Sequence, residues 1–133
     1  MKANTVEDII KKYQAFFDEN KWLDENVSCP KGWLWLIDNL LEQLVFLTTH
    51  KNQPQLKVVQ IKEKFGGLRF YVDKKGTDVQ SELISFVENL SYNVCQDCGT
   101  TENVGKTQGW LTTVCGKCVQ NYTPKYKDTW KCN

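Results

Sequence analysis

The chain has 133 residues, of which 41% are hydrophobic and 25% charged, and its formal net charge is +1. This composition predicts a folded chain with one ordinary core and a small additional module, and it excludes an intrinsically disordered chain. The overall charge argues neither for nor against a nucleic-acid partner, although the basic residues gather locally, with seven Lys or Arg against two acids in residues 51–75.

Two helices are predicted before any strand. The first is amphipathic, begins at the capping signal formed by Thr5 and Asp8, and runs to about Asn20. The second begins near Gly32, is apolar on nearly all sides, and ends where a loop begins at Thr48. We expect its polar strip to face outward: Asp38, Asn39, Glu42 and Gln43.

The stretch from Val58 to Val72 is the most specific part of the chain. Two β-prone runs flank the pair Gly66-Gly67, which predicts a β-hairpin with these two glycines as the turn. Antiparallel counting then places Glu63 opposite Phe70. Alternation assigns a packed face with Val59, Ile61, Glu63, Phe65, Leu68, Phe70 and Val72.

The opposite, solvent-facing side of the hairpin carries the basic face, which we define as Lys62, Lys64, Arg69 and Tyr71. Clustered cations beside an aromatic ring suit a phosphate or an acidic partner surface. The alternative is that the lysines protect an exposed sheet edge against aggregation.

Glu63 is an unusual residue because a carboxylate among apolar neighbours needs a hydrogen-bond partner or a proton. We favour a structural acceptor that is bonded by a helix N-terminus or by a lysine packed over the sheet. The alternative is a functional acid, either a catalytic acid or base or a ligand-binding group.

A third helix, capped by Thr77 or Asp78, is expected to cover the hairpin with the stripe Val79, Leu83, Phe86, Val87, Leu90 and Val94. The element order predicts an α+β fold, in which helices pack on a small antiparallel hairpin. We expect this domain to occupy residues 1–94, followed by a zinc-ribbon module in residues 95–133.

The zinc prediction depends on four cysteines: Cys95, Cys98, Cys115 and Cys118. Their spacing, C-x2-C-x16-C-x2-C, is typical of one structural zinc ion held by four thiolates. We expect backbone N–H groups, made accessible by the glycines at 99 and 116, to donate hydrogen bonds to the sulfurs. A redox dithiol is the competing interpretation. Four-cysteine coordination leaves no open position for hydrolysis at the metal.

The remaining cysteines and the tail allow alternatives. Cys29 is expected to be a small core residue rather than a nucleophile. The tail from Tyr122 to Cys132 alternates aromatic residues with lysines. We favour a strap that packs Tyr122, Tyr126 and Trp130 on the domain, although the same pattern can bind single-stranded nucleic acid.

Several of these motifs together resemble a family of small, largely uncharacterised proteins of bacteriophages and bacteria. The resemblance lies in the stretch from Cys29 to Ile37, in the Lys62–Tyr71 sequence KEKFGGLRFY, and in the two cysteine pairs with Gly109-Trp110 between them. It covers roughly residues 29–118 and implies a phage or mobile-element setting but no catalytic residues.

No nucleophile–base pair, phosphate loop or dinucleotide motif is recognisable, so we expect no enzyme. The predicted function is a small zinc-stapled binding protein, an accessory factor that engages a host protein or nucleic acid through the basic face. The alternatives are a protein that sequesters a nucleotide signal and an enzyme that uses Glu63. With no export signal and no long apolar run, we expect a cytoplasmic protein without membrane contact, in the host cytoplasm if phage-encoded.

Overall fold

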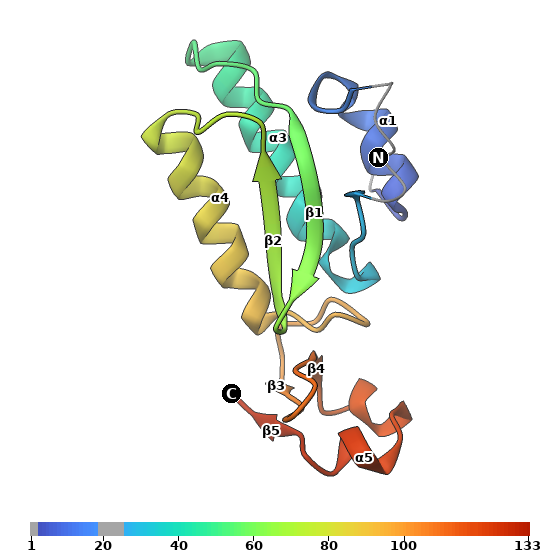
Figure 1. Cartoon of the computed structure of the whole chain (residues 1–133). Coiled ribbons are helices and arrows are strands. Elements are labelled where there is room, and N and C mark those ends of the chain that lie inside the picture. Colours follow the sequence, from blue (N-terminus) through green and yellow to red (C-terminus); the bar gives the residue numbers. More distant parts are fainter. Residues whose placement is uncertain (1–2, 19–25) are drawn as a thin grey trace.

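The computed structural model describes residues 3–18 and 26–133 and shows an α+β fold (Figure 1). The helices are α1 (Val6–Lys12), α3 (Leu34–His50), α4 (Asp78–Leu90) and α5 (Pro124–Lys127), with 3-10 turns η1 (Gln14–Phe16), η2 (Lys31–Trp33), η3 (Ser91–Asn93) and η4 (Cys118–Asn121). The strands are β1 (Val58–Lys64), β2 (Gly67–Val72), β3 (Val104–Lys106), β4 (Thr113–Cys115) and β5 (Lys131–Cys132).

The first predicted helix is shorter than expected. Thr5 and Asp8 form the predicted capping box, but α1 ends at Lys12 and η1 follows. Tyr13 leaves the helical conformation and its hydroxyl donates to the backbone carbonyl of Asp38 on α3 at 2.9 Å. This tertiary contact accompanies the early end of the helix. The predicted end at Asn20 lies outside the described residues.

The central helix α3 provides most of the core, as predicted, and continues through His50 instead of ending at Thr48. Its buried residues pack with the hairpin, α1 and α4 in one cluster. The prediction that Asp38 faces outward is wrong, because its exposed fraction is 9%. The other three residues of the polar strip are exposed. Among the described residues, no helix is long and apolar enough to cross a bilayer.

The hairpin forms, but its turn lies one residue earlier than predicted. Lys64 pairs with Gly67, so Phe65 and Gly66 are the turn, and Glu63 lies opposite Leu68 rather than Phe70. Both turn residues have positive φ, 54° and 82°, which is typical of a type I′ turn. An irregularity in the register follows Val58.

This register changes the membership of the packed face. Ile61, Leu68 and Phe70 are buried as predicted, but Phe65 is 66% exposed because it lies in the turn. Val59 is also exposed and Val58 is buried instead, as expected from the irregularity between Val58 and Gln60.

Helix α4 begins after Thr77, which forms a capping box with Gln80. The predicted stripe is confirmed at Val87 and Val94, which are buried, and at Leu83 and Leu90, which pack against the core, but not at its two other positions. The buried residues of α4 are Gln80, Ile84 and Val87, whereas Val79 and Phe86 are exposed. The helix lies along β2, where the carboxylate of Glu88 accepts the N–H of Phe70 at 2.8 Å. Figure 1 shows α3 and α4 packed together on one side of the two-stranded sheet.

A second, smaller cluster of buried residues lies after residue 94 and consists of Cys95, Val104, Val114, Cys115 and Val119. It is built around a three-stranded antiparallel sheet with the order β4-β3-β5. We call this part the ribbon. The tip of the hairpin points toward it (Figure 1), and the hydroxyl of Thr113 donates to the carbonyl of Gly66 at 2.6 Å.

Candidate functional site

The four cysteines of the ribbon meet at one point. The sulfur atoms of Cys95, Cys98, Cys115 and Cys118 all lie within 4.8 Å of one another. The sulfur atoms of Cys98 and Cys115 are 3.9 Å apart, close to the separation of about 3.8 Å that a tetrahedral site with bonds of about 2.3 Å requires. Four cysteine sulfurs in this arrangement can hold a metal ion.

The surroundings favour the thiolate form at one of the four cysteines, Cys115, whereas burial raises the pKa of Cys95 and Cys118. Burial raises the pKa of Cys115, but the N–H and thiol of Cys118 and the N–H of Lys117 outweigh it and lower the pKa to about 7. The N–H of Cys118 lies 3.3 Å from the Cys115 sulfur. The N–H of Gly116 itself bonds Asn103. Donors that stabilise a thiolate also orient it as a metal ligand.

The first cysteine pair is fixed directly onto the start of the central helix. The N–H of Gly32 donates to the carbonyl of Gln96 at 2.7 Å, and the indole N–H of Trp35 donates to the carbonyl of Gly99 at 3.1 Å. A Cβ on Gly32 would lie 2.0 Å from the carbonyl oxygen of Cys95. The Cys95–Cys98 turn therefore depends on a glycine at position 32 for its close approach.

The basic face lies where the sequence predicts it. Lys62 and Arg69 are directly opposite each other on β1 and β2, and Gln60 is opposite Tyr71. The side chains of Tyr71 and Lys64 are exposed. Two cations opposite each other repel and destabilise an isolated hairpin, so this arrangement is consistent with a role beyond folding.

Glu63 is a structural acceptor, as we favoured, although its partner differs from the expected ones. Its carboxylate accepts the N–H of Gly66 at 2.7 Å and so closes the turn. The side chain is half-buried at the end of the sheet. Four hollows in the described residues have volumes of about 380 to 490 Å³, and none of these four is lined by Glu63.

Two residues beside the basic face were not singled out from the sequence. The hydroxyl of Tyr92, in η3, accepts a hydrogen bond from Arg69 at 3.1 Å. The ammonium of Lys106, on β3 of the ribbon, lies 4.2 Å from the centre of the Tyr92 ring. The sequence carries no signal for this contact, because it depends on how the ribbon docks on the hairpin.

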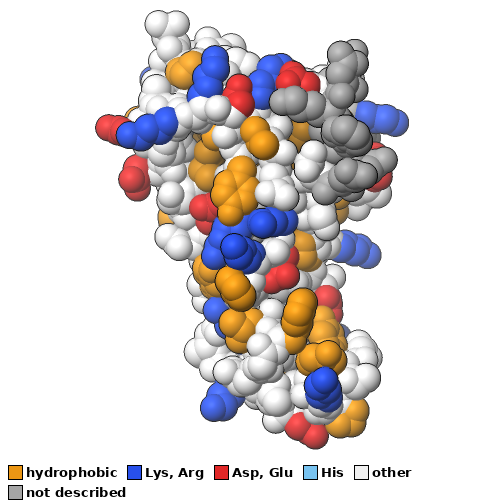
Figure 2. Space-filling model, in the orientation of Figure 1, with side chains coloured by type: hydrophobic (Ala, Val, Ile, Leu, Met, Phe, Trp, Pro, Cys, Tyr) orange, Lys and Arg blue, Asp and Glu red, His pale blue; other side chains and the backbone are white. Residues whose placement is uncertain are grey.

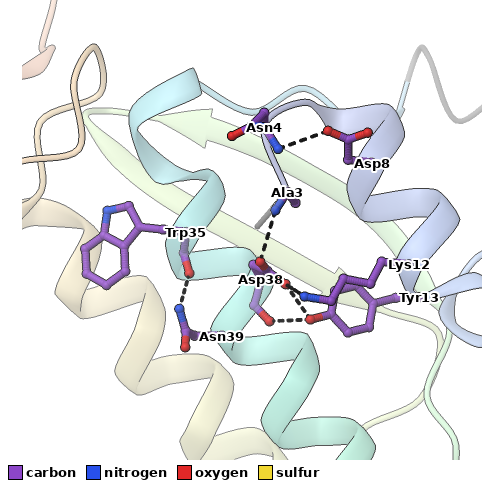
Figure 3. A network of polar contacts seen from close by, with 8 residues as sticks. All are labelled: Ala3, Asn4, Asp8, Lys12, Tyr13, Trp35, Asp38 and Asn39. Carbon is purple, nitrogen blue, oxygen red and sulfur yellow. Dashed lines mark hydrogen bonds and ion pairs between the residues drawn. The ribbon is translucent and has the colours of Figure 1, made fainter. Parts of the chain in front are cut away.

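A second polar constellation surrounds Asp38 (Figure 3). Its carboxylate accepts from Tyr13, from Lys12 at 3.0 Å and from the N–H of Ala3 at 3.4 Å. Burial raises the pKa of Asp38, but these bonds outweigh it and hold the pKa below the ordinary value. Asp38 also lines a hollow of about 460 Å³. The bonds from Lys12 and Tyr13 join the end of α1 to α3, so we assign Asp38 a structural role.

The remaining sequence predictions concern single groups. Cys29 packs against the core, and burial raises the pKa of its thiol to about 12, which disfavours a nucleophilic thiolate. The strap is confirmed for Tyr122 and Trp130, which pack on the ribbon core, while the ring of Tyr126 lines a hollow with Trp110. The exposed His50 packs beside Phe46.

No protein-family model matches this chain, and no curated protein or solved structure matches it either.

Proposed function

We infer that the chain is a small binding protein, stapled by one structural zinc ion, that engages a macromolecular partner through the basic face. The observation that carries this proposal is the direct opposition of Lys62 and Arg69 across the hairpin. Neither cation lies within 4.0 Å of a carboxylate in the part of the chain that the structure describes. A surface of this kind is suited to a partner that brings negative charge.

Zinc is the metal that best fits four cysteine ligands. Thiolate sets of this kind select zinc or iron–sulfur clusters, and paired C-x-x-C turns with tetrahedral sulfur separations are typical of structural zinc. The ion would have all four positions filled by protein. Its role in this proposal is to hold the ribbon together, not to bind substrate.

The structure of the hairpin disfavours the alternative of an enzyme that uses Glu63. Glu63 bonds the backbone of its own turn, which supports a structural role instead of general acid or base chemistry. The basic face lies on the side of the two-stranded sheet opposite its buried residues. The accessory role in a phage or mobile element is part of this proposal and derives only from the sequence motifs of residues 29–118.

The test is capture of partners from a lysate of the host by the purified full chain, with and without nuclease. The comparison is with the double variant Lys62→Glu/Arg69→Glu, which changes the net charge by −4. We expect the variant to fold, since both side chains are half-buried and neither belongs to the core, and to lose several-fold or more of the captured partner at physiological salt. Unchanged capture by the folded variant would show that the face protects a sheet edge.

A matched control separates the local face from the total charge. Lys11→Glu/Lys51→Glu makes the same change in net charge at two exposed lysines of α1 and of the residue after α3. We expect this control to capture partners as the unchanged protein does. Equal losses in both double variants would contradict a role for the basic face.

A further inference from the structure

The basic face does not end at the hairpin but continues onto the ribbon. The ammonium of Lys62 lies 5.9 Å from the centre of the Tyr71 ring. On the opposite strand, Arg69 donates to the hydroxyl of Tyr92, whose ring lies under the ammonium of Lys106. With Lys62 and Arg69 opposite each other, these contacts form a continuous row of cations and aromatic rings that crosses from the sheet to the ribbon.

A further pair stands at the tip of the hairpin. The ammonium of Lys64 lies 5.6 Å from the centre of the Phe65 ring. Phe65 has a φ of 54°, which is unusual for a bulky residue and costs conformational energy, yet its ring is mostly exposed and not used in the core. We define the cation–aromatic track as Lys62, Lys64, Phe65, Arg69, Tyr71, Tyr92 and Lys106.

Figure 2 shows basic and hydrophobic side chains intermixed down the middle of this face, over the sheet and over the ribbon below it. No cation of the track forms an ion pair within the described residues. The two nearby carboxylates are engaged elsewhere, because Glu63 accepts the N–H of Gly66 and Glu88 accepts the N–H of Phe70. Both carboxylates keep their negative charge, and that of Glu88 acts on Arg69, but the four cations of the track outnumber them and leave a net positive charge for a ligand.

We propose, building on the proposed function above, that the cation–aromatic track binds single-stranded nucleic acid. Phosphates would bond the lysines and Arg69, while unpaired bases would stack on the rings of Tyr71, Phe65 and Tyr92. This combination of a basic surface and exposed aromatic rings is the general solution for binding single strands with little sequence preference. A duplex hides its base faces and cannot use the rings.

A protein partner fits these residues less well. The buried centres of protein interfaces are depleted in charged side chains, lysine in particular, whereas cations make up more than half of the track. The lysines also rest on aromatic rings in weak, exposed contacts. A phosphate oxygen forms a stronger, charge-assisted bond, so it can draw a lysine away and leave the ring face for a base.

The experiment measures the fluorescence anisotropy of labelled single strands of about 16 nucleotides, the upper end of known site sizes. Oligo(U) and oligo(dU) probes are titrated with the zinc-loaded full chain, and a duplex of equal length is the competitor. Single strands should bind at least ten-fold more tightly than the duplex. A plot of the logarithm of the affinity against the logarithm of the salt concentration should have a slope of about −2 to −3. This slope follows from three to four cations that each contact one phosphate, at about 0.7 per contact.

Three variants test separate parts of the track. Tyr71→Leu should weaken binding about ten-fold by removing a stacking ring, whereas Phe86→Leu, at an exposed aromatic residue of α4, should change nothing. Lys106→Ala should weaken binding and reduce the salt slope by about 0.7, because one phosphate contact is lost. Lys11→Glu/Lys51→Glu should bind the strands as the unchanged protein does. A melting curve for each variant confirms that it is folded.

The outcomes distinguish this inference from the proposed function. Three results would each contradict the binding of single strands by the track. They are tight binding of the duplex, equal losses of affinity in Tyr71→Leu and Phe86→Leu, and unchanged affinity in Lys106→Ala. If no strand binds, but a nuclease-resistant partner is captured in a manner that depends on Lys62 and Arg69, the proposed function holds and the nucleic-acid inference is wrong. If neither occurs, both are wrong. A preference for oligo(U) over oligo(dU), which differ only in the 2′-hydroxyl, would identify RNA as the source.

Discussion

Replacing Gly32 by alanine tests whether the metal centre is tied to the central helix. The added Cβ would lie 2.0 Å from the carbonyl oxygen of Cys95 and 2.7 Å from the carbonyl carbon and oxygen of Gln96. All three atoms belong to the backbone, so no side chain can rotate away. The Cys95–Cys98 turn would have to move by more than 1 Å to reach an ordinary contact distance of about 3.4 Å.

The cost follows from two contributions. Forced overpacking costs about 1–3 kcal/mol, and weakening the bond from the Gly32 N–H to Gln96 costs about 1 kcal/mol more. Gly32→Ala should therefore lower the free energy of unfolding by about 2–4 kcal/mol, which is a large share of the 5–15 kcal/mol of a typical domain. The melting temperature should fall by roughly 5–15 °C.

Two measurements check this expectation, namely denaturant unfolding of the zinc-loaded chain and loss of the metal to a competing chelator. The matched control is Gly109→Ala. That position has a φ of 77° with no atom within 4 Å of the added Cβ, so it should cost about 1 kcal/mol from backbone strain and leave the metal affinity unchanged. Equal stability and equal chelator resistance of Gly32→Ala and the unchanged protein would refute the close docking.

The remaining predictions concern the metal, the turn and the buried carboxylate. Metal analysis should give one zinc per chain, and a folded metal-free chain with four titratable thiols would contradict the zinc site. Glu63→Gln should cost little stability, whereas Glu63→Ala should cost about 1–3 kcal/mol by leaving the Gly66 N–H unsatisfied; equal melting temperatures would contradict its acceptor role. Phe65→Asn should lower the free energy of unfolding by less than about 0.5 kcal/mol, because relief of about 1–2 kcal/mol of backbone strain offsets the lost burial of a mostly exposed ring. The control Phe86→Asn should lower it by about 1 kcal/mol. Equal losses in the two variants would contradict the strain at Phe65. The pKa of Asp38 is lowered in the folded state, so the stability that its carboxylate contributes is complete above about pH 4 and is lost as the pH falls through the folded pKa. Asp38→Asn should lower the free energy of unfolding by about 1–3 kcal/mol at pH 7. In melting curves from pH 6 to 2, this variant should be less sensitive to acid than the unchanged protein.

The hairpin shows how far a single sequence constrains a fold. Alternation placed Lys62 and Arg69 correctly on the solvent side, because both registers keep them there. The turn was misplaced because adjacent glycines serve different purposes. Gly66 supplies the positive φ of the turn, whereas Gly67 is needed because a Cβ there would lie 2.3 Å from the ring of Tyr92. That second requirement comes from tertiary packing and leaves no local pattern.

The same distinction applies to the candidate sites. The cysteine cluster was predictable because the spacing of the cysteines is itself the signal, and the four sulfurs do meet. Asp38 was misplaced because it was grouped with the polar residues that follow it on α3, while its partners Lys12 and Tyr13 come from the end of α1. Tyr92 and Lys106 escaped detection for a related reason, since they meet only through the docking of the ribbon.

The docking of the ribbon also makes the metal centre a possible control point for ligand binding. Lys106 belongs to the sheet that the cysteines hold together, while Arg69 and Tyr92 belong to the layer beside it. If loss of the metal releases the ribbon from the hairpin, a ligand that contacts both sides would bind the metal-loaded chain more tightly than the metal-free chain. By thermodynamic reciprocity, the ligand then raises the affinity for the metal by the same factor. Metal supply and occupancy of the track would rise and fall together, with no contact between the ion and the ligand.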